Sequence, residues 1–206
     1  MKLFLKLFIF SVILISCDSE SDDQISTSIQ SGICEARTTD FKDITNQLLA
    51  IPNLEWEIMS FNASTVQSYN FRLSQQKNLC KIGYRSLTNE NAIFKIQIKN
   101  NATGVVIYDV DQSFDDDLIG YNDVTGIQLD SNVSYSIYRT NLSFDYINNL
   151  GHVLLINEFT VDCDLDFLPI TSGSLTIESA SLIDNVNSSN NMIMSAITYI
   201  DVVFED

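Results

Sequence analysis

The sequence predicts an all-β protein, an antiparallel β-sandwich of about ten strands with one short N-terminal helix. Apolar residues alternate with polar ones over most of the chain, and polar segments separate the alternating runs. Only two prolines and seven glycines interrupt the 206 residues, of which 45% are hydrophobic. Alternation with a period of two places every second side chain on the same face of a sheet. We therefore expect two sheets that bury their apolar faces against each other.

The helix is expected at residues 39–51. Thr39 and Asp40 are residue types that cap helix N-termini, and Pro52 ends the pattern. The apolar residues between them have helical spacing and are Phe41, Ile44, Leu48 and Ile51. This spacing places the four side chains on one face of a short helix.

The strands follow in order, each marked by apolar residues two positions apart. They are expected at residues 54–58, 69–73, 80–84, 94–98, 105–110, 133–137, 152–167, 175–177 and 196–204. Residues 100–104 are typical of a hairpin turn, and residues 185–191 of a polar loop. We expect residues 34–206 to form a single β-sandwich domain. A change in charge balance near Leu150 leaves a split there as the alternative.

Residues 1–16 have the pattern of a secretory signal peptide. Lys2 and Lys6 precede an apolar run, residues 7–15, which ends in Ser16-Cys17. The run is far shorter than the roughly 20 residues that a helix needs to cross a bilayer. The pattern resembles the lipobox of bacterial lipoproteins, which implies lipidation of Cys17. An ordinary signal peptide with a coincidental cysteine is the alternative.

Residues 17–33 are polar, lack periodicity and predict an acidic flexible tether. Four of the first six residues after Cys17 are acidic, and this run resembles the export signal that sends lipoproteins of the Bacteroidota to the cell surface. We therefore expect a lipid-anchored, surface-exposed protein of the outer membrane. Its first partner would be the membrane, because two or three acyl chains make attachment durable.

The chain is strongly acidic, with 27 acidic against 11 basic residues and a formal net charge of −16. No lysine or arginine follows Arg139. Nucleic acid is therefore not an expected partner, because binding it depends on neutralising phosphate charges.

Besides Cys17 the chain has three cysteines, Cys34, Cys80 and Cys163. They allow one disulfide, in any of three pairings, and one free thiol. An oxidising envelope permits such a bridge. Alternation places Cys80 on the same face as Ile82 and Tyr84, which indicates a small buried core residue.

Two acidic clusters invite a metal-site hypothesis. Residues 109–117 include the candidate calcium ligands Asp109, Asp111, Asp115 and Asp117, since calcium takes six to eight oxygen ligands. A solvated hairpin or loop is the leading interpretation there, and no cofactor is expected. Residues 162–166 superficially resemble the start of an EF-hand loop but lack its later glycine and glutamate, which indicates an amphipathic strand.

Tyr121, Tyr138 and Tyr146 fall outside the clearest inward pattern and are candidates for a glycan platform. The rival interpretation is that they lie in the core or at its rim with the hydroxyl reaching water. No catalytic residue is assigned. His152 is the only histidine and lacks the surroundings of a catalytic triad. Paired carboxylates of a glycosidase would occur by chance among 27 acidic residues.

Strand and turn motifs within residues 66–142, among them residues 71–73, 79–84, 94–98 and 134–140, resemble a β-sandwich domain of unknown function in Bacteroidota surface lipoproteins. The resemblance implies a fold and a surface address, and no activity. We therefore expect a lipid-anchored, non-enzymatic cell-envelope protein that acts by binding a glycan or an envelope protein. One alternative is a carbohydrate-binding lipoprotein of a polysaccharide-uptake system, and another is a glycosidase-like enzyme.

Overall fold

The computed structural model describes residues 33–51, 56–61, 66–85, 92–114, 119–142, 151–156, 167–183 and 196–205. These residues belong to a compact unit that spans Gly32–Asp206. The predicted signal peptide, Cys17 and the tether up to residue 32 lie outside the described residues. Among the described residues, no helix is long and apolar enough to cross a membrane.

Helix α1 (Asp40–Leu49) forms where the sequence predicts a helix. Thr39 is its N-cap, and the Thr39 hydroxyl accepts a hydrogen bond from the backbone N–H of Lys42 at 3.1 Å. Acidic residues in the first turn favour the helix because they lie near the positive end of its dipole. The apolar face is buried as expected, with Phe41, Ile44 and Leu48 at most 1% exposed.

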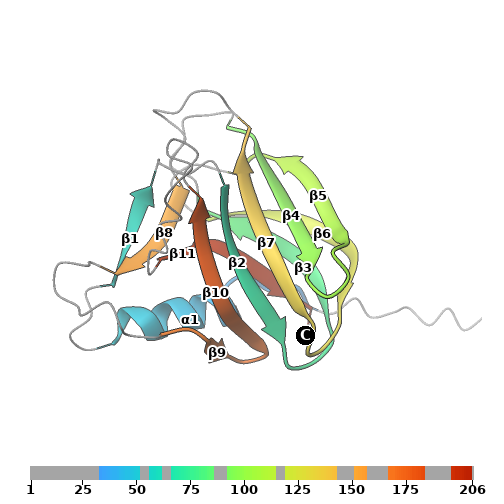
Figure 1. The fold of residues 1–206 in the computed structure, drawn as a ribbon, viewed down its shortest axis with the longest axis horizontal. Helices are drawn as coiled ribbons and strands as arrows, with labels where there is room; N and C mark the ends of the chain where they lie inside the picture. Colours follow the sequence, from blue (N-terminus) through green and yellow to red (C-terminus); the bar gives the residue numbers. More distant parts are fainter. Residues whose placement is uncertain are drawn as a thin grey trace, which may run out of the picture. The chain divides into compact units, whose positions relative to one another are not determined.

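The largest sheet has six antiparallel strands in the order β5-β4-β7-β2-β10-β9. Figure 1 shows these strands side by side, with α1 beside β9 at one end of the sheet. The strands are β2 (Val66–Leu73), β4 (Phe94–Asn100), β5 (Val106–Gln112), β7 (Ser134–Asn141), β9 (Ile170–Ser172) and β10 (Leu175–Ile183).

Two antiparallel three-stranded sheets complete the described part of the fold, in the orders β12-β3-β6 and β1-β8-β11. The first consists of β3 (Lys77–Tyr84), β6 (Gly120–Leu129) and β12 (Ile200–Phe204). The second consists of β1 (Trp56–Phe61), β8 (Gly151–Ile156) and β11 (Ala196–Thr198).

The core lies between the six-stranded sheet and the sheet β12-β3-β6. The ring of Tyr84 on β3 meets the ring of Phe94 on β4 edge-on, with centroids 5.1 Å apart. The Tyr69 hydroxyl on β2 donates a hydrogen bond to the carbonyl of Ile200 on β12 at 2.7 Å. Helix α1 joins the same core through Phe41, which stacks on Tyr69 at 5.7 Å. The predicted all-β sandwich is confirmed.

Arg139 is a charged residue inside this core, with 1% of its surface exposed. It continues the inward alternation of Tyr135 and Ile137 on β7. Its guanidinium lies 4.7 Å from the ring centre of Phe94 and 5.3 Å from that of Tyr84. Such cation–π contacts offset part of the cost of removing the charge from water. Arg139 is therefore part of the core and not of an exposed site.

Strand β6 is the main element that the sequence analysis did not predict. Its apolar residues do not alternate strictly, because Gly126 has a φ of +74° and the pairing with β3 shifts register between Leu79 and Lys81. A bulge of this kind breaks the period of two on which the prediction depends. The strand expected through residues 157–166 and the polar loop at residues 185–191 lie outside the described residues.

Candidate functional site

A cleft of about 450 Å³ lies where α1 begins. Four segments that are distant in the sequence form its walls: residues 35–40, the β2–β3 turn with the start of β3 (residues 74–77), the β9–β10 turn (residues 173–174) and the end of β12 (residues 202–204). Its lining is mainly polar. This cleft is the candidate site.

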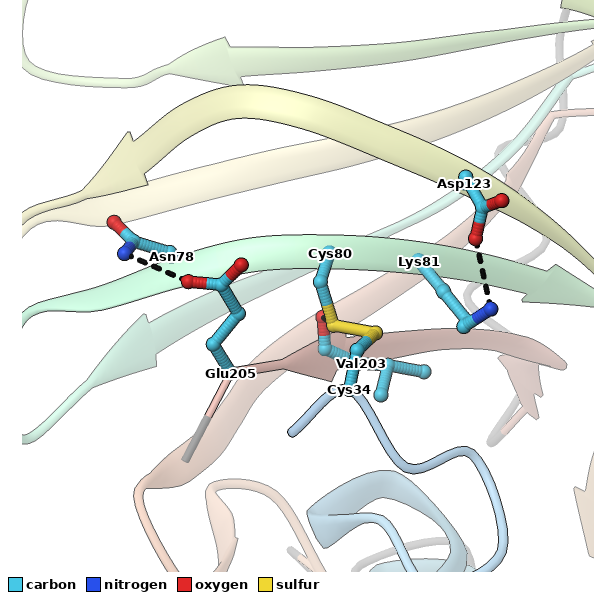
Figure 2. Close-up of a disulfide and its surroundings, with 7 residues drawn as sticks. All are labelled: Cys34, Asn78, Cys80, Lys81, Asp123, Val203 and Glu205. Carbon is cyan, nitrogen blue, oxygen red and sulfur yellow. Dashed lines mark hydrogen bonds and ion pairs between the residues drawn. A yellow bond between two sulfur atoms is a disulfide. The ribbon is translucent and has the colours of Figure 1, made fainter. Parts of the chain in front are cut away.

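A disulfide holds the first wall of the cleft in place. Cys34, just before residues 35–40, is bonded to Cys80 on β3 (Figure 2). This is one of the three pairings that the sequence left open, and Cys80 is buried in the core as alternation predicted. The Cys80 sulfur also lies 3.3 Å from the carbonyl oxygen of Val203, a packing contact, since a disulfide sulfur has no proton to donate. Cys163 lies outside the described residues.

A buried hydrogen-bonded cluster holds the same wall from the helix side. The hydroxyls of Thr39 and Tyr121 both donate to Oδ2 of Asp201, at 3.0 Å and 2.6 Å. The Nζ of Lys42 lies 5.2 Å from the centre of the Tyr121 ring. The cluster therefore links the start of α1 to β6 and β12.

The Tyr121 ring reaches Asp201 by crossing over Gly83. The register pairs Gly83 of β3 with Asp201 on one side and with Tyr121 on the other, so the three residues share one face of the sheet. A Cβ at Gly83 would lie 2.7 Å from Cδ1 of Tyr121 and 2.9 Å from Cγ2 of Ile119. Only glycine leaves room for the ring at this position.

Asp201 is fully buried, and its Oδ1 has no hydrogen-bond partner within the described part of the chain. Burial raises the pKa of its carboxyl group, and the hydrogen bonds from Tyr121 and Thr39 oppose that rise. The pKa of the Tyr121 hydroxyl is raised as well, first by burial and then by the charge of Asp201. The Tyr121 hydroxyl therefore keeps its proton and donates its hydrogen bond to Asp201 over the whole physiological pH range.

Asp40 projects from the first turn of α1 into the cleft. Its Oδ2 accepts hydrogen bonds from the backbone N–H and the hydroxyl of Ser174, at 2.8 Å and 2.9 Å. Gly173 has a φ of +52°, and a Cβ there would lie 2.6 Å from the carboxylate carbon of Asp40. The β9–β10 turn thus fixes the orientation of this carboxylate.

Three charged side chains meet in the cleft: Glu35, Asp40 and Lys77. Among the described residues, none of the three takes part in an ion pair. Charged groups that border one concavity without neutralising one another can bind and orient a ligand there. For that reason the cleft is the best candidate site in the described structure.

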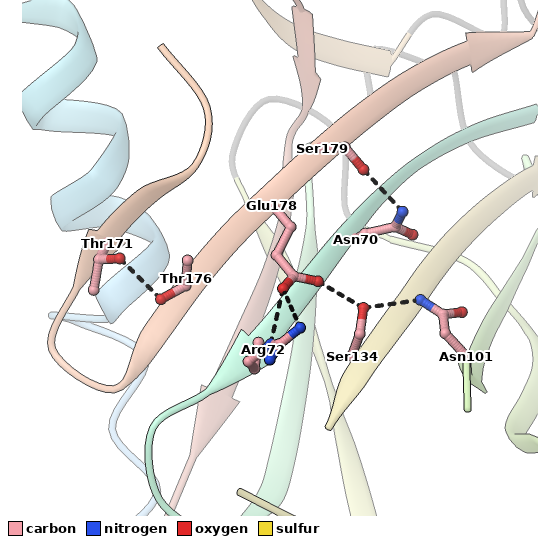
Figure 3. Close-up of polar contacts among 8 residues, drawn as sticks. All are labelled: Asn70, Arg72, Asn101, Ser134, Thr171, Thr176, Glu178 and Ser179. Carbon is pink, nitrogen blue, oxygen red and sulfur yellow. Dashed lines mark hydrogen bonds and ion pairs between the residues drawn. The ribbon is translucent and has the colours of Figure 1, made fainter. Parts of the chain in front are cut away.

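The outer face of the six-stranded sheet shows the opposite arrangement (Figure 3). Oε1 of Glu178 accepts from Nε and Nη2 of Arg72, both at 2.8 Å, and Oε2 accepts from the Ser134 hydroxyl at 2.6 Å. Ser134 also accepts from the Asn101 side chain at 3.1 Å. Farther along β2 and β10, the amide of Asn70 donates to a serine hydroxyl at 2.8 Å. These polar groups satisfy one another.

Two of the four candidate calcium ligands belong to this outer face. Asp109 and Asp111 on β5 both lie 3.4 Å from Nζ of Lys95, and Gln97 donates to Asp109 at 2.9 Å. Asp109, followed by Asp111, raises the pKa of Lys95. Asp115 and Asp117 lie outside the described residues. Within the described residues, no group of three or more His, Cys, Asp or Glu side chains is arranged to hold a metal.

The two candidate platform tyrosines within the described residues, Tyr121 and Tyr138, lie on different sheets. The Tyr121 ring is not available for stacking on a sugar, because its hydroxyl donates to buried Asp201 and Lys42 covers the ring. Tyr138 is half-buried on β7 in the other sheet, opposite Ser68 and Gln97. Tyr146 and the side chain of His152 lie outside the described residues.

Sequence reasoning found one part of the cleft, the helix start at Thr39 and Asp40. It missed the rest because the walls come from segments as far apart as residues 35 and 204. No protein-family model matches the chain, and the search of curated proteins finds no match.

Proposed function

We propose that this chain is a lipid-anchored, non-enzymatic protein of the bacterial cell envelope that binds a ligand in the cleft at the start of α1. Cys17 would carry the lipid, and residues 17–33 would tether the sandwich to the outer membrane with the domain facing outward. The observation that carries the binding role is the convergence of Glu35, Asp40 and Lys77 in one cleft without an ion pair between them.

The disulfide supports an envelope location. A bridge between Cys34 and Cys80 persists in oxidising compartments and is rare in the reducing cytosol. The bridge also lies next to the proposed tether and attaches the first described residues to β3. The lipobox pattern and the disulfide are independent features, and both favour an exported protein.

The proposal assigns no catalytic step. The carboxyl group of Asp201, whose pKa is raised, is fully buried, hydrogen-bonded to Thr39 and Tyr121, and does not line the cleft. A general acid has to come within hydrogen-bonding distance of the bond that it protonates. Binding without chemistry is therefore the function that the geometry favours.

Anchoring is tested with Cys17→Ser in cells labelled with a radioactive fatty acid. We expect the variant to lose the label and to leave the membrane fraction, whereas the control Cys163→Ser keeps both. Proteinase K added to intact cells should digest the unmutated protein if the domain faces outward. Unchanged labelling of Cys17→Ser would refute the anchor, and full protection from the protease would refute the outward location.

A further inference from the structure

We propose that the cleft recognises one or two neutral sugar units of a glycan, an inference that rests on the proposed binding function. Its volume of about 450 Å³ falls within the roughly 300–1,000 Å³ that is usual for small-molecule sites. The chemistry of its walls decides the class of ligand.

The cleft offers hydrogen-bond donors and acceptors in nearly equal measure. The carboxylates of Glu35 and Asp40 accept, and the ammonium of Lys77 donates. The hydroxyls of Thr38 and Ser74 and the amide of Gln75 can do both, whereas the Ser174 hydroxyl already donates to Asp40 and can only accept. A sugar matches this mixture, because each of its hydroxyls can donate one hydrogen bond and accept others.

Other ligand classes fit less well. A phosphate or another strong anion needs a surplus of cationic donors, whereas here one lysine stands against two carboxylates on a protein of formal net charge −16. A largely apolar ligand needs apolar walls. A metal ion needs several ligands at one point, and the described residues provide no such group.

The end of β12 supplies the apolar surface that one face of a sugar ring requires. Phe204 lines the cleft beside its polar groups and is only partly buried, whereas Val202 and Val203, which also border the cleft, are at most 2% exposed. The face of an aromatic ring is electron-rich, so it attracts the weakly positive C–H groups of a sugar. The polar groups and the Phe204 side chain together offer the two kinds of contact that a pyranose ring makes.

The site is also held in shape before any ligand arrives. Ser174 fixes the carboxylate of Asp40, and the Cys34–Cys80 disulfide fixes the segment that carries Glu35 and Thr38. Preorganisation lowers the entropy cost of binding, which matters for ligands that bind mainly through hydrogen bonds.

The test is saturation-transfer NMR and calorimetry on full-length protein purified from membranes in a polyoxyethylene detergent, since a sugar-based detergent would compete. The probes are glucose, galactose, mannose and N-acetylglucosamine at millimolar concentration, with glucuronate as the anionic comparison. We expect saturable binding of at least one neutral sugar and weaker binding of glucuronate.

The matched variants are neighbours in the same turn. Gln75 lines the cleft, whereas Gln76 donates to Asp130 outside it. Gln75→Ala should weaken sugar binding about tenfold, the value of one good hydrogen bond, and Gln76→Ala should leave it unchanged. Lys77→Met should weaken it to a similar extent.

Three results would overturn the inference: no saturable signal from any neutral sugar, tighter binding of glucuronate, or equal loss in the Gln75 and Gln76 variants. The anchor is judged separately by fatty-acid labelling. A protein that is lipidated and surface-exposed but binds no sugar would refute this inference alone, and a protein that binds sugar without Cys17 lipidation would refute the anchor alone.

Discussion

The outer face of the six-stranded sheet and the cleft at the start of α1 are both polar, but their side chains are used differently. On the outer face, Arg72 pairs with Glu178, and Lys95 pairs with Asp109 and Asp111. In the cleft, Glu35, Asp40 and Lys77 converge without an ion pair. A polar surface whose groups satisfy one another has less to offer a ligand than one whose groups do not.

The two regions also differ in how they are supported. The side chains of the outer face project from the strands of one continuous hydrogen-bonded sheet, which holds them in place. Three attachments hold the wall formed by residues 35–40: the disulfide to Cys80, the hydrogen bond from Thr39 to Asp201 and the hydrogen bonds from Ser174 to Asp40. Loss of the disulfide or of the Thr39–Asp201 hydrogen bond should therefore damage the cleft and spare the outer face.

The largest effect is expected from the disulfide. It closes a loop with a sequence separation of 46, for which the chain-entropy model gives about 4 kcal/mol of unfolding free energy. Cys34→Ser should therefore lower the denaturation midpoint strongly and speed hydrogen exchange in residues 35–40, while exchange in β2, β7 and β10 of the native state stays slow. Asn78→Ala, which removes an exposed hydrogen bond to Glu205 beside the bridge, is the control. Equal effects of both variants would contradict the prediction.

Gly83→Ala should have the next largest effect. Its added methyl would lie 2.7 Å from the Tyr121 ring and 2.9 Å from the Ile119 side chain. These distances are too short for carbon atoms, so both side chains would have to move. Forcing the ring away also breaks its hydrogen bond to Asp201, so we expect a loss of about 1–3 kcal/mol by chemical denaturation. Gly104→Ala separates this crowding from the backbone effect, because that glycine has a positive φ but open space around it. A milder loss for Gly83→Ala than for Gly104→Ala would show that the ring does not depend on this glycine.

The sequence predicted the sandwich more fully than it predicted the site. Alternation identifies β2, β3, β4 and β7 because one face of each is buried, and the capping residues identify α1. It does not identify β6, where Gly126 and a register shift interrupt the pattern. Asp201 was also missed, since it lies within the apolar stretch that ends the chain and its role depends on Tyr121, 80 residues earlier. Interactions of this kind leave no local pattern.

The buried carboxyl of Asp201 should make stability depend on pH. Its pKa in the folded state is raised above the ordinary 3.8, so folding favours the protonated form. The stability that this group contributes is complete below its unfolded-state pKa and is lost as the pH rises through the higher folded-state value. Asp201→Asn cannot lose that proton. The variant should therefore gain relative to the unmutated protein as the pH rises from 3.8, by up to about 1.4 kcal/mol for each pH unit within the window.

Urea unfolding between pH 4 and 8 measures that difference. Asp123→Asn is the matched control, because Asp123 pairs with Lys81 at 2.7 Å on the same sheet and its side chain is 80% exposed. Its difference from the unmutated protein should change much less over the same range. If the unfolding free energies of Asp201→Asn and the unmutated protein change in parallel with pH, the pKa of Asp201 is not raised in the folded state.

The smallest effect is expected on the outer face. Arg72 and Glu178 form an ion pair at 2.8 Å, but their side chains are 45% and 27% exposed, so water screens the attraction. Arg72→Met should cost no more than about 1 kcal/mol in urea unfolding, and added salt should shrink the difference further. The same variant should leave binding of a neutral sugar in the cleft unchanged, whereas Lys77→Met weakens it at little cost in stability. A sugar affinity that falls in Arg72→Met and survives in Lys77→Met would reverse the roles of the two surfaces and move the binding site to the sheet.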